Sequence, residues 1–196
     1  SEFCVMSEAD KVQVIVPVRA RLPRWRVRAG YAVAVLYAWQ AEPSVPSLVL
    51  GAMIAAMGLL IRGAAAGYLR KNERLTTGGP YAYTRNPLYL GSALLAAGLV
   101  VAGGSWLAAL AVTGYVGIFY PAAMRFEEQH LRKLHTRAYD DYASHVPLFF
   151  PRLTPSAAMH DQTPFSWELY KANREQQAAI GAAVAIALLA TKMWFL

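Results

Sequence analysis

Two long stretches of the chain, residues 43–61 and 86–124, contain no charged side chain. Charged residues make up only 16% of the 196 residues, whereas soluble domains average about 25%. In the hydrocarbon core of a bilayer each backbone N–H and C=O must be paired within the protein, and a helix does this within one segment. The sequence therefore predicts an all-α integral membrane protein and argues against a soluble domain.

The apolar segments predict about five transmembrane helices in one membrane domain that covers residues 1–196. The segments are 29–41, 47–68, 87–102, 106–124 and 178–196. The first is short against the ~20 residues that a bilayer requires, so it spans only if it tilts or includes residues that precede it. Arg62, late in the second segment, is placed to reach the interface or a polar cavity.

Proline and serine mark the expected ends and bends of these helices. Pro87 suits the first position of the third span. Pro121 is expected to kink the fourth span near its end, because proline removes a backbone hydrogen bond. Ser166 is a candidate N-cap for a single C-terminal helix over residues 166–196, which begins polar and ends apolar.

Residues 127–146 are predicted to form a separate amphipathic helix after the fourth span. Glu128 and Arg132 are four residues apart and can pair on its polar side. Apolar side chains recur at spacings of three and four, which places them on one face of a helix: Leu131, Leu134, Ala138 and Tyr142. A helix of this kind can lie at the membrane surface.

Apart from Lys192, the basic residues fall in three blocks, 11–28, 62–85 and 125–174, and the net charge is +7. The first block ends a basic N-terminal segment, residues 1–28. All three blocks can lie on one side of a bilayer, as the positive-inside rule requires of cytoplasmic loops. The N-terminus and the large loops are therefore predicted to be cytoplasmic, and the C-terminus to lie outside. Nucleic-acid binding is disfavoured, because the charge follows the loops of a membrane protein.

A polar cluster surrounds Arg85, where a charged loop leads into the third span. An arginine at the mouth of a helical bundle offers a planar fork of donors for a carboxylate or a phosphate. Asn86 adds an amide donor and acceptor, and Tyr81 and Tyr89 add aromatic faces with hydroxyl tips. An arginine that only sets the topology, beside interfacial tyrosines, gives the same pattern, so both interpretations stay open here.

A second polar cluster, further along the chain, begins with Glu127 and Glu128. These carboxylates can accept hydrogen bonds from a ribose diol or an ammonium group, or they can be an acidic pair that favours the start of a helix. Tyr139 and Tyr142 are three residues apart and face the same way on a helix. They can wall an adenine slot, or they can pack at the interface.

No metal site is predicted. His130 and His135 lie on the same predicted helix, but a spacing of five residues points them about 140° apart. The single cysteine, Cys4, excludes an internal disulfide and any site built from several cysteines. No glycine-rich loop follows a strand, so a Rossmann nucleotide site is not supported.

Two blocks of motif residues occur in order, with a charge-free hairpin between them. They are Gly79-Pro80-Tyr81 with Arg85-Asn86-Pro87-Leu88-Tyr89-Leu90-Gly91, and then Glu127-Glu128-Gln129-His130-Leu131 with Tyr139-Asp140-Asp141-Tyr142 and Val146-Pro147. Together they resemble the isoprenylcysteine carboxyl methyltransferase and phospholipid methyltransferase group of membrane enzymes. The resemblance covers residues 70–153, the expected catalytic core.

The resemblance implies S-adenosylmethionine as the methyl donor and a lipophilic acceptor. It implies a cytoplasmic cofactor pocket between the loop before the third span and the amphipathic helix after the fourth. Arg85 would help to orient the acceptor or a carboxylate, and Glu127, or Glu128 in its place, would act as general base for a protonated acceptor. The residues implied in cofactor binding are Tyr81, Asn86, Pro87, Tyr89, Leu90, Gly91, Glu128, Tyr139 and Tyr142.

The chain departs from the family pattern at two places. Asn86 replaces the usual histidine, and Leu134-His135 stands where many relatives have Phe-Gly. The acceptor therefore stays open between an isoprenylcysteine-type carboxylate, a phospholipid amine and a small thiol. Two alternatives are a sterol-type membrane reductase that uses NADPH and a non-catalytic scaffold or transporter. A transporter site is expected near mid-bilayer, whereas these polar clusters lie at one interface.

Overall fold

The computed structural model describes residues 24–70, 74–156 and 163–195, so most of the predicted basic segment 1–28 lies outside the described residues. All regular structure in the described part is helical, which confirms the all-α prediction. The elements are α1 (Arg24–Gln40), α2 (Val45–Tyr68), the short 3-10 helix η2 (Gly79–Ala82), α3 (Pro87–Gly103), α4 (Trp106–His145), α5 (Trp167–Ala172) and α6 (Gln176–Phe195).

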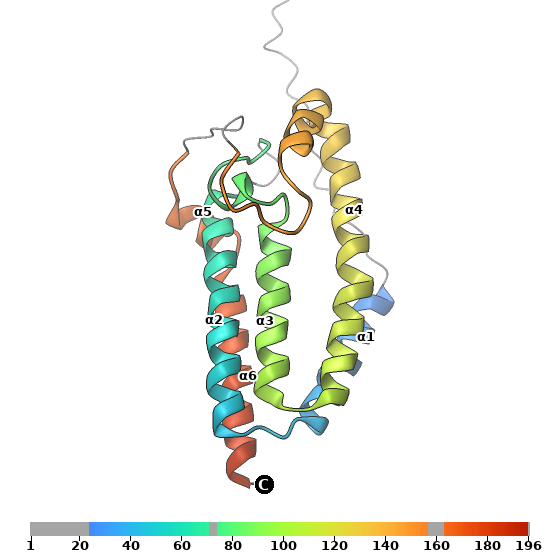
Figure 1. Cartoon of the computed structure of the whole chain (residues 1–196), viewed down its shortest axis with the longest axis vertical. Coiled ribbons are helices and arrows are strands. Elements are labelled where there is room, and N and C mark those ends of the chain that lie inside the picture. Colours follow the sequence, from blue (N-terminus) through green and yellow to red (C-terminus); the bar gives the residue numbers. More distant parts are fainter. Residues whose placement is uncertain (1–23, 71–73, 157–162, 196) are drawn as a thin grey trace, which may run out of the picture.

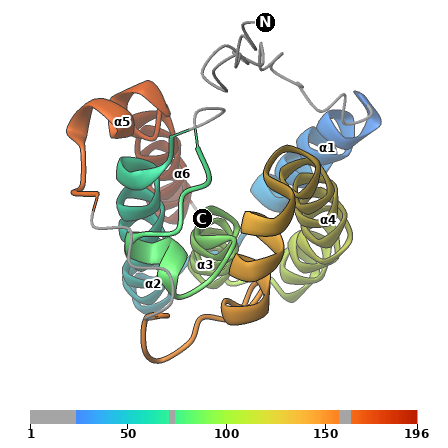
Figure 2. The ribbon, with the colours of Figure 1, turned by 90° about the horizontal axis from the view of Figure 1, so that it is seen from above.

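The long helices run up and down along one axis (Figure 1). Short connections, residues 41–44 and 104–105, join them at one end, which we call the turn end. The longer segments 74–86 and 146–156 lie at the opposite end, the loop end, and the C-terminus lies at the turn end. Seen from above, α1 lies beside α4, while α2, α3 and α6 form a second group (Figure 2).

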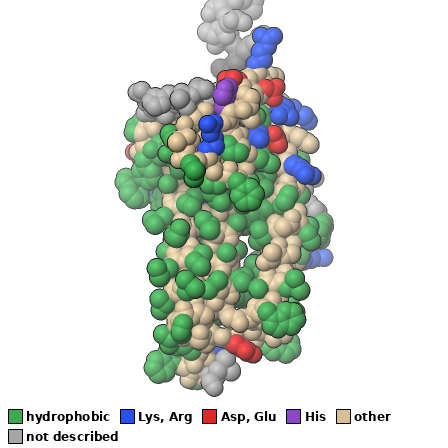
Figure 3. Space-filling view, viewed as in Figure 1, with side chains coloured by type: hydrophobic (Ala, Val, Ile, Leu, Met, Phe, Trp, Pro, Cys, Tyr) green, Lys and Arg blue, Asp and Glu red, His purple; other side chains and the backbone are tan. Residues whose placement is uncertain are grey.

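Among the described residues, three helices are long and apolar enough to cross a membrane: α2, α4 and α6. Helix α3 is also apolar but has 17 residues, and α1 has 17 residues as well. Apolar side chains cover the body of the molecule, and charged side chains gather mainly at the loop end (Figure 3). The chain is thus an integral membrane protein, and the count of about five spans stays a prediction.

Helices α2 and α3 approach each other backbone to backbone. A Cβ atom added at Gly98 would lie 2.4 Å from Ala55 N and 2.6 Å from Gly51 O. One added at Gly58 would lie 2.6 Å from Gly91 O. Small residues at helix interfaces permit this closeness in a membrane, where association depends on van der Waals packing and not on water exclusion.

The turn end is closed by hydrogen bonds to backbone groups. Ser44 and Ser47 form a capping box at the start of α2, and Ser47 Oγ also donates to Ala102 O at 3.2 Å. Lys192 near the end of α6 donates to Ala38 O and Trp39 O, both at 2.8 Å. The capping box satisfies N–H groups at the start of α2, and the Ser47 and Lys192 contacts satisfy carbonyl groups near the ends of α3 and α1.

The predicted break between the fourth span and the amphipathic helix was wrong. Helix α4 continues from Trp106 to His145 through Pro121, and the non-helical residue inside it is Thr136, with φ 33° and ψ −109°. A proline inside a helix crowds the carbonyl four residues earlier, here that of Gly117, and a Cβ added at Gly117 would have nothing within 4 Å. The backbone there has room to adjust, so the helix passes the proline without ending.

The kink at Thr136 changes which face of the following segment is buried. The predicted apolar stripe placed Ala138 on the packed face, but Ala138 is exposed. Tyr139 is buried in its place, with 2% of its surface exposed. The stripe assumed an unbroken period of 3.6 residues, and the left-handed backbone at Thr136 shifts that register.

The single C-terminal helix predicted over residues 166–196 is two helices. Ser166 is the predicted N-cap, since its hydroxyl accepts from Leu169 N at 3.3 Å. The helix then breaks between α5 and α6, where Arg174 has φ 56°. Asn173 in this break donates to Ala66 O at 2.9 Å and to Leu69 O at 3.0 Å, so the break caps the end of α2.

The α2–α3 contact predicts opposite effects for two glycine-to-alanine changes. Gly98→Ala pushes a methyl group into the backbone of α2, and overpacking of this kind costs about 1–3 kcal/mol. Gly114→Ala on α4 meets nothing within 4 Å and gains about 1 kcal/mol of helix propensity. We expect the thermal midpoint in detergent micelles to fall for the first variant and to hold or rise for the second. Equal midpoints would contradict the close approach of α2 and α3.

Candidate functional site

At the loop end, the Arg85 side chain contacts the C-terminal part of α4. Arg85 Nη1 donates to Glu128 Oε1 at 2.8 Å and to the Tyr139 hydroxyl at 3.3 Å. The side chains of Arg85 and Glu128 are only 13% and 20% exposed. A hydrogen bond between charged groups withdrawn from water is stronger than a surface ion pair. The two predicted polar clusters are therefore in direct contact.

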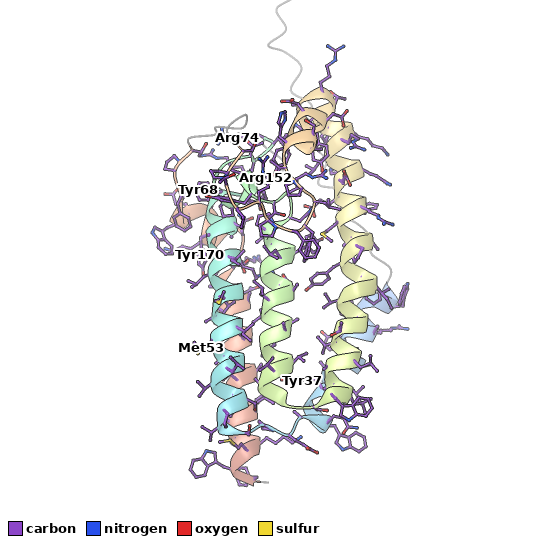
Figure 4. The ribbon with its side chains drawn as sticks, in the orientation of Figure 1. Tyr37, Met53, Tyr68, Arg74, Arg152 and Tyr170 are labelled. Atoms are coloured by element: carbon purple, nitrogen blue, oxygen red, sulfur yellow. The ribbon has the colours of Figure 1, made fainter. Side chains whose placement is uncertain are left out.

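Hydrogen bonds to backbone carbonyls of the proline-rich segment 146–156 hold residues 84–86, which we call the Arg85 corner, in place. The bonds are Arg85 N to Pro147 O at 2.9 Å, Asn86 Nδ2 to Leu148 O at 3.0 Å and Thr84 Oγ1 to Phe149 O at 2.9 Å. In the opposite direction, Arg152 N donates to Tyr83 O at 3.0 Å. Arg152 is labelled at this end of the molecule in Figure 4.

Three tyrosines that the sequence singled out come together here. Tyr142 donates from its hydroxyl to Tyr81 O at 2.7 Å. The Tyr139 and Tyr142 rings meet edge to face, with centroids 6.2 Å apart, and both are 2% exposed. They pack with Val146. Tyr142 thus clamps η2 onto α4, while the role of either ring toward a ligand stays a prediction.

Arg132 extends the charge network across the kink. It lies 3.5 Å from Glu128 Oε1, the pair expected from sequence, and 2.8 Å from Asp140 Oδ1. Its guanidinium carbon also lies 5.8 Å from the centre of the Tyr139 ring. Eight residues rise about 12 Å along a straight helix, so the Asp140 contact depends on the bend at Thr136.

One hydrogen-bond donor in this charge network has no acceptor in the part of the chain that the structure describes. Among the described residues, Arg85 Nε is buried and lacks a hydrogen bond. A buried N–H without a partner costs about 1–3 kcal/mol, and such exceptions call for an explanation. Arg85 Nε can serve an anionic group of a ligand, while the nearby Glu128 carboxylate can serve a cationic or hydroxyl group.

The residues at the start of α3 that the sequence predicts to bind the cofactor contact other parts of the helices. Pro87 is fully buried at the start of the helix, and Leu90 N donates to Asn86 O at 3.0 Å. The Tyr89 ring packs on Tyr120 of α4, with centroids 5.4 Å apart. Gly91 faces α2, where an added Cβ would lie 2.6 Å from Arg62 Cγ. Their part in cofactor binding stays a prediction.

Glu127 is exposed and acts electrostatically on Tyr81. Burial raises the pKa of the Tyr81 phenol far above its ordinary value, and the negative charges of Glu127 and Glu175 raise it further. Burial likewise raises the pKa of Tyr139, against the hydrogen bond from Arg85, which lowers it. Both phenols therefore stay protonated at neutral and mildly alkaline pH and can act as hydrogen-bond donors.

Sequence reasoning missed the partner of Arg62. The Arg62 side chain forms an ion pair with Glu175, which is 6% exposed, and Nη2 donates to Glu175 Oε2 at 3.0 Å. Arg62 is the single charge between residues 43 and 69, which is a signal of function in an apolar helix. Nothing in the sequence marks Glu175, since it lies more than a hundred residues away at an unpredicted helix break.

Within the described ranges, no group of three or more histidine, cysteine, aspartate or glutamate side chains is placed to hold a metal ion.

Comparison with known proteins supports the motif resemblance. The family model described as phospholipid methyltransferase matches residues 46–138. The cobalt-zinc-cadmium resistance protein CzcN of Cupriavidus metallidurans is 34% identical, over 69% of this chain and 66% of its own length. The nickel-cobalt-cadmium resistance protein NccN of Alcaligenes xylosoxydans xylosoxydans is 32% identical, over 69% of this chain and 67% of its own length. No solved structure matches.

The chain therefore belongs to the phospholipid methyltransferase family of membrane proteins. The matched region contains the Arg85 corner, Glu127 and Glu128, and it ends just before Tyr139. The chain spans about two thirds of the length of both relatives, just under that share for the first, at 66%, and just over it for the second, at 67%.

Replacing Tyr142 with phenylalanine tests the clamp between η2 and α4. Burial raises the pKa of the Tyr142 phenol above its ordinary value of 10.0. The folded protein therefore holds this proton to a higher pH than the unfolded chain. The resulting stability is fully present below about pH 10 and is lost as the pH rises toward the folded-state pKa.

We expect Tyr142→Phe to lower the free energy of unfolding by about 1 kcal/mol at neutral pH, because one hydrogen bond is lost. Its thermal midpoint should fall less steeply than that of the wild type between about pH 9 and pH 11. Tyr31→Phe is the control, since Tyr31 is 71% exposed, and it should match the wild type throughout. A Tyr142→Phe profile with the wild-type slope would refute the assignment.

Proposed function

We propose that this protein transfers a methyl group from S-adenosylmethionine to a lipophilic acceptor at the membrane interface. The observation that carries the proposal is the contact of Arg85 with Glu128 and Tyr139 at the loop end, with Arg85 Nε left over as a buried donor. Membership in the phospholipid methyltransferase family supports the reaction class.

The hydrogen-bonding groups at the loop end are complementary to the charged groups of S-adenosylmethionine. Arg85 Nε is suited to the carboxylate of the methionine part, since a guanidinium fork matches a carboxylate. The Glu128 carboxylate is suited to the ammonium group or to the ribose hydroxyls. Tyr139, whose hydroxyl accepts a hydrogen bond from Arg85, lies beside this carboxylate, and Tyr81 and the first turn of α3 complete the surroundings.

The bound donor supplies an electrophilic methyl group on a sulfonium. The protein therefore needs chiefly to align the acceptor and to exclude water. Arg85 is held through Nη1, which donates to both Glu128 and Tyr139, so its other nitrogens can orient an acceptor or a carboxylate without a rearrangement of the side chain. Glu127 is exposed beside this site and is the candidate general base for a protonated acceptor.

The position of the site at the loop end favours a lipophilic acceptor and a cytoplasmic loop end. An apolar acceptor reaches this level from the bilayer, whereas the polar donor arrives from water. The basic blocks favour a cytoplasmic loop end. A phospholipid amine accords with the family description, and a prenylated carboxylate and a small thiol are the other acceptors to test.

Two substitutions test the donor site by calorimetry with S-adenosylhomocysteine and by a radiolabelled methyl assay on lipid and thiol extracts. Glu128→Ala should weaken binding by about 10- to 100-fold, because a hydrogen bond to a charged group is lost. Arg85→Ala should lower turnover by about 100-fold or more and weaken binding by only about 10-fold, because Arg85 is expected both to orient the acceptor and to meet the carboxylate of the methyl donor. Asp141→Asn, on an exposed acid of the same helix, is the control.

Three other outcomes would contradict the role of Arg85 or favour a different function. Equal losses of affinity and turnover in Arg85→Ala would contradict the role given to Arg85. Binding of NADPH with no binding of S-adenosylhomocysteine would favour a sterol-type reductase. If the wild type binds neither S-adenosylhomocysteine nor NADPH, a scaffold or a transporter would be favoured.

We also propose that the methyl transfer contributes to tolerance of divalent transition metals. The observation behind this is that two relatives are named as metal resistance proteins. In a metal-sensitive bacterial strain, expression of the wild type should permit growth at higher cobalt, zinc or cadmium concentrations, and Arg85→Ala should not. Equal protection by Arg85→Ala would separate tolerance from methyl transfer, and no protection by the wild type would contradict this role.

A further inference from the structure

A second buried charge network lies between α2, α3 and the break before α6. Arg62 on α2 binds both oxygens of the Glu175 carboxylate, through Nε and through Nη2 at 3.0 Å. Its remaining nitrogen, Nη1, contacts Ser92 Oγ and approaches Leu88 O at 3.5 Å. Each guanidinium nitrogen therefore has an acceptor, and the acceptors come from two other parts of the fold.

Stability alone does not account for such a pair. Removing two charges from water costs several kcal/mol per ion, and apolar replacements of buried ion pairs are often neutral or stabilising. Glu175 is 6% exposed and Arg62 is 22% exposed, so both are largely withdrawn from solvent. Because burying the Arg62–Glu175 pair costs free energy, we look for its role in the structural elements that its hydrogen bonds hold in position.

On one side, the network forms hydrogen bonds with the start of α3. Ser92 Oγ donates to Leu88 O at 2.7 Å, so Arg62 Nη1 binds at a point where side chain and backbone of α3 already meet. Leu88 comes directly after the Asn86-Pro87 corner. Gly91 makes this possible, because any Cβ there would lie 2.6 Å from Arg62 Cγ.

On the other side the network fixes the junction of α5 and α6. Glu175 N donates to Tyr170 O at 3.3 Å, and Asn173 caps the end of α2 through two bonds. Tyr170 lies at the α2 side of the molecule near the loop end (Figure 4). The junction is therefore anchored to α2, and the Glu175 carboxylate is held in a fixed place.

We propose that Arg62 and Glu175 form a brace that positions the start of α3, and with it the Arg85-Asn86 corner, against α4. Gly91 serves the brace, since its missing side chain leaves room for the Arg62 stem. The effect of the brace on methyl-donor binding rests on the proposed function, but its effect on the backbone at the corner does not. Arg62 is thus a positioning residue that acts through α3.

Hydrogen–deuterium exchange of the full-length protein in lipid nanodiscs tests the brace without any assumption about chemistry. Arg62→Lys keeps the charge opposite Glu175 but lacks the fork that also reaches α3. Amides over residues 85–91 should exchange about tenfold faster in this variant. Amides over residues 103–109, at the turn end, should exchange as in the wild type.

Two further variants separate positioning from general stability. Ser47→Ala removes the α2–α3 contact at the turn end and should leave residues 85–91 unchanged. Ser92→Ala removes one acceptor on α3 while the ion pair with Glu175 stays, and it should speed exchange over residues 85–91 even if Arg62→Lys fails to fold. Unchanged exchange there in Ser92→Ala, or a uniform rise along the whole chain in both brace variants, would overturn the proposal.

Calorimetry of the same variants with S-adenosylhomocysteine connects the brace to the site. Weaker binding in Arg62→Lys, with Ser47→Ala like the wild type, is the expected result. If the wild type itself does not bind, the proposed function fails, and the exchange data still decide on the brace. If the wild type binds and Arg62→Lys matches it in both affinity and exchange, the brace fails and the proposed function stands.

Discussion

The close contact between α2 and α3 is the constraint on which the rest of the structure depends. Gly58 and Gly98 bring the two backbones within van der Waals distance, and in a membrane such packing takes the place of the hydrophobic effect. Since α3 is fixed along its length, its first residue, Pro87, has a fixed place at the loop end. The close approach also means that the Arg62 side chain needs a gap, which Gly91 supplies.

The candidate site is built from hydrogen bonds to backbone carbonyls and from buried charge. The corner at Arg85 is held by bonds to the segment after α4, so the position of its side chain does not depend on a flexible loop. Arg85 then meets Glu128 where little water reaches either group. Electrostatic interactions are stronger in such surroundings than in water, and the buried Nε atom of Arg85 gives this site one donor to spare.

The family assignment and the geometry support each other. The phospholipid methyltransferase match ends at residue 138, close to the kink at Thr136. Beyond that boundary the structure adds the buried Tyr139 and the pairing of residues 147–149 with the Arg85 corner. Two relatives are named as metal resistance proteins, and the proposed role in metal tolerance rests on those names.

The helical membrane class could be predicted from the sequence, because long charge-free stretches in lipid must pair their backbone groups within the protein and a helix does so within one segment. The sequence also determined that Arg85 and Glu128 belong to matching motif blocks, and it placed Ser166 at a helix start. The folded structure was needed to show that α4 continues through Pro121 and loses helical backbone geometry at Thr136, and that Glu175 is the partner of Arg62. Local periodicity reports on neighbours three or four residues away, whereas a left-handed residue inside a helix and an ion pair between distant segments depend on contacts that form after the helices pack.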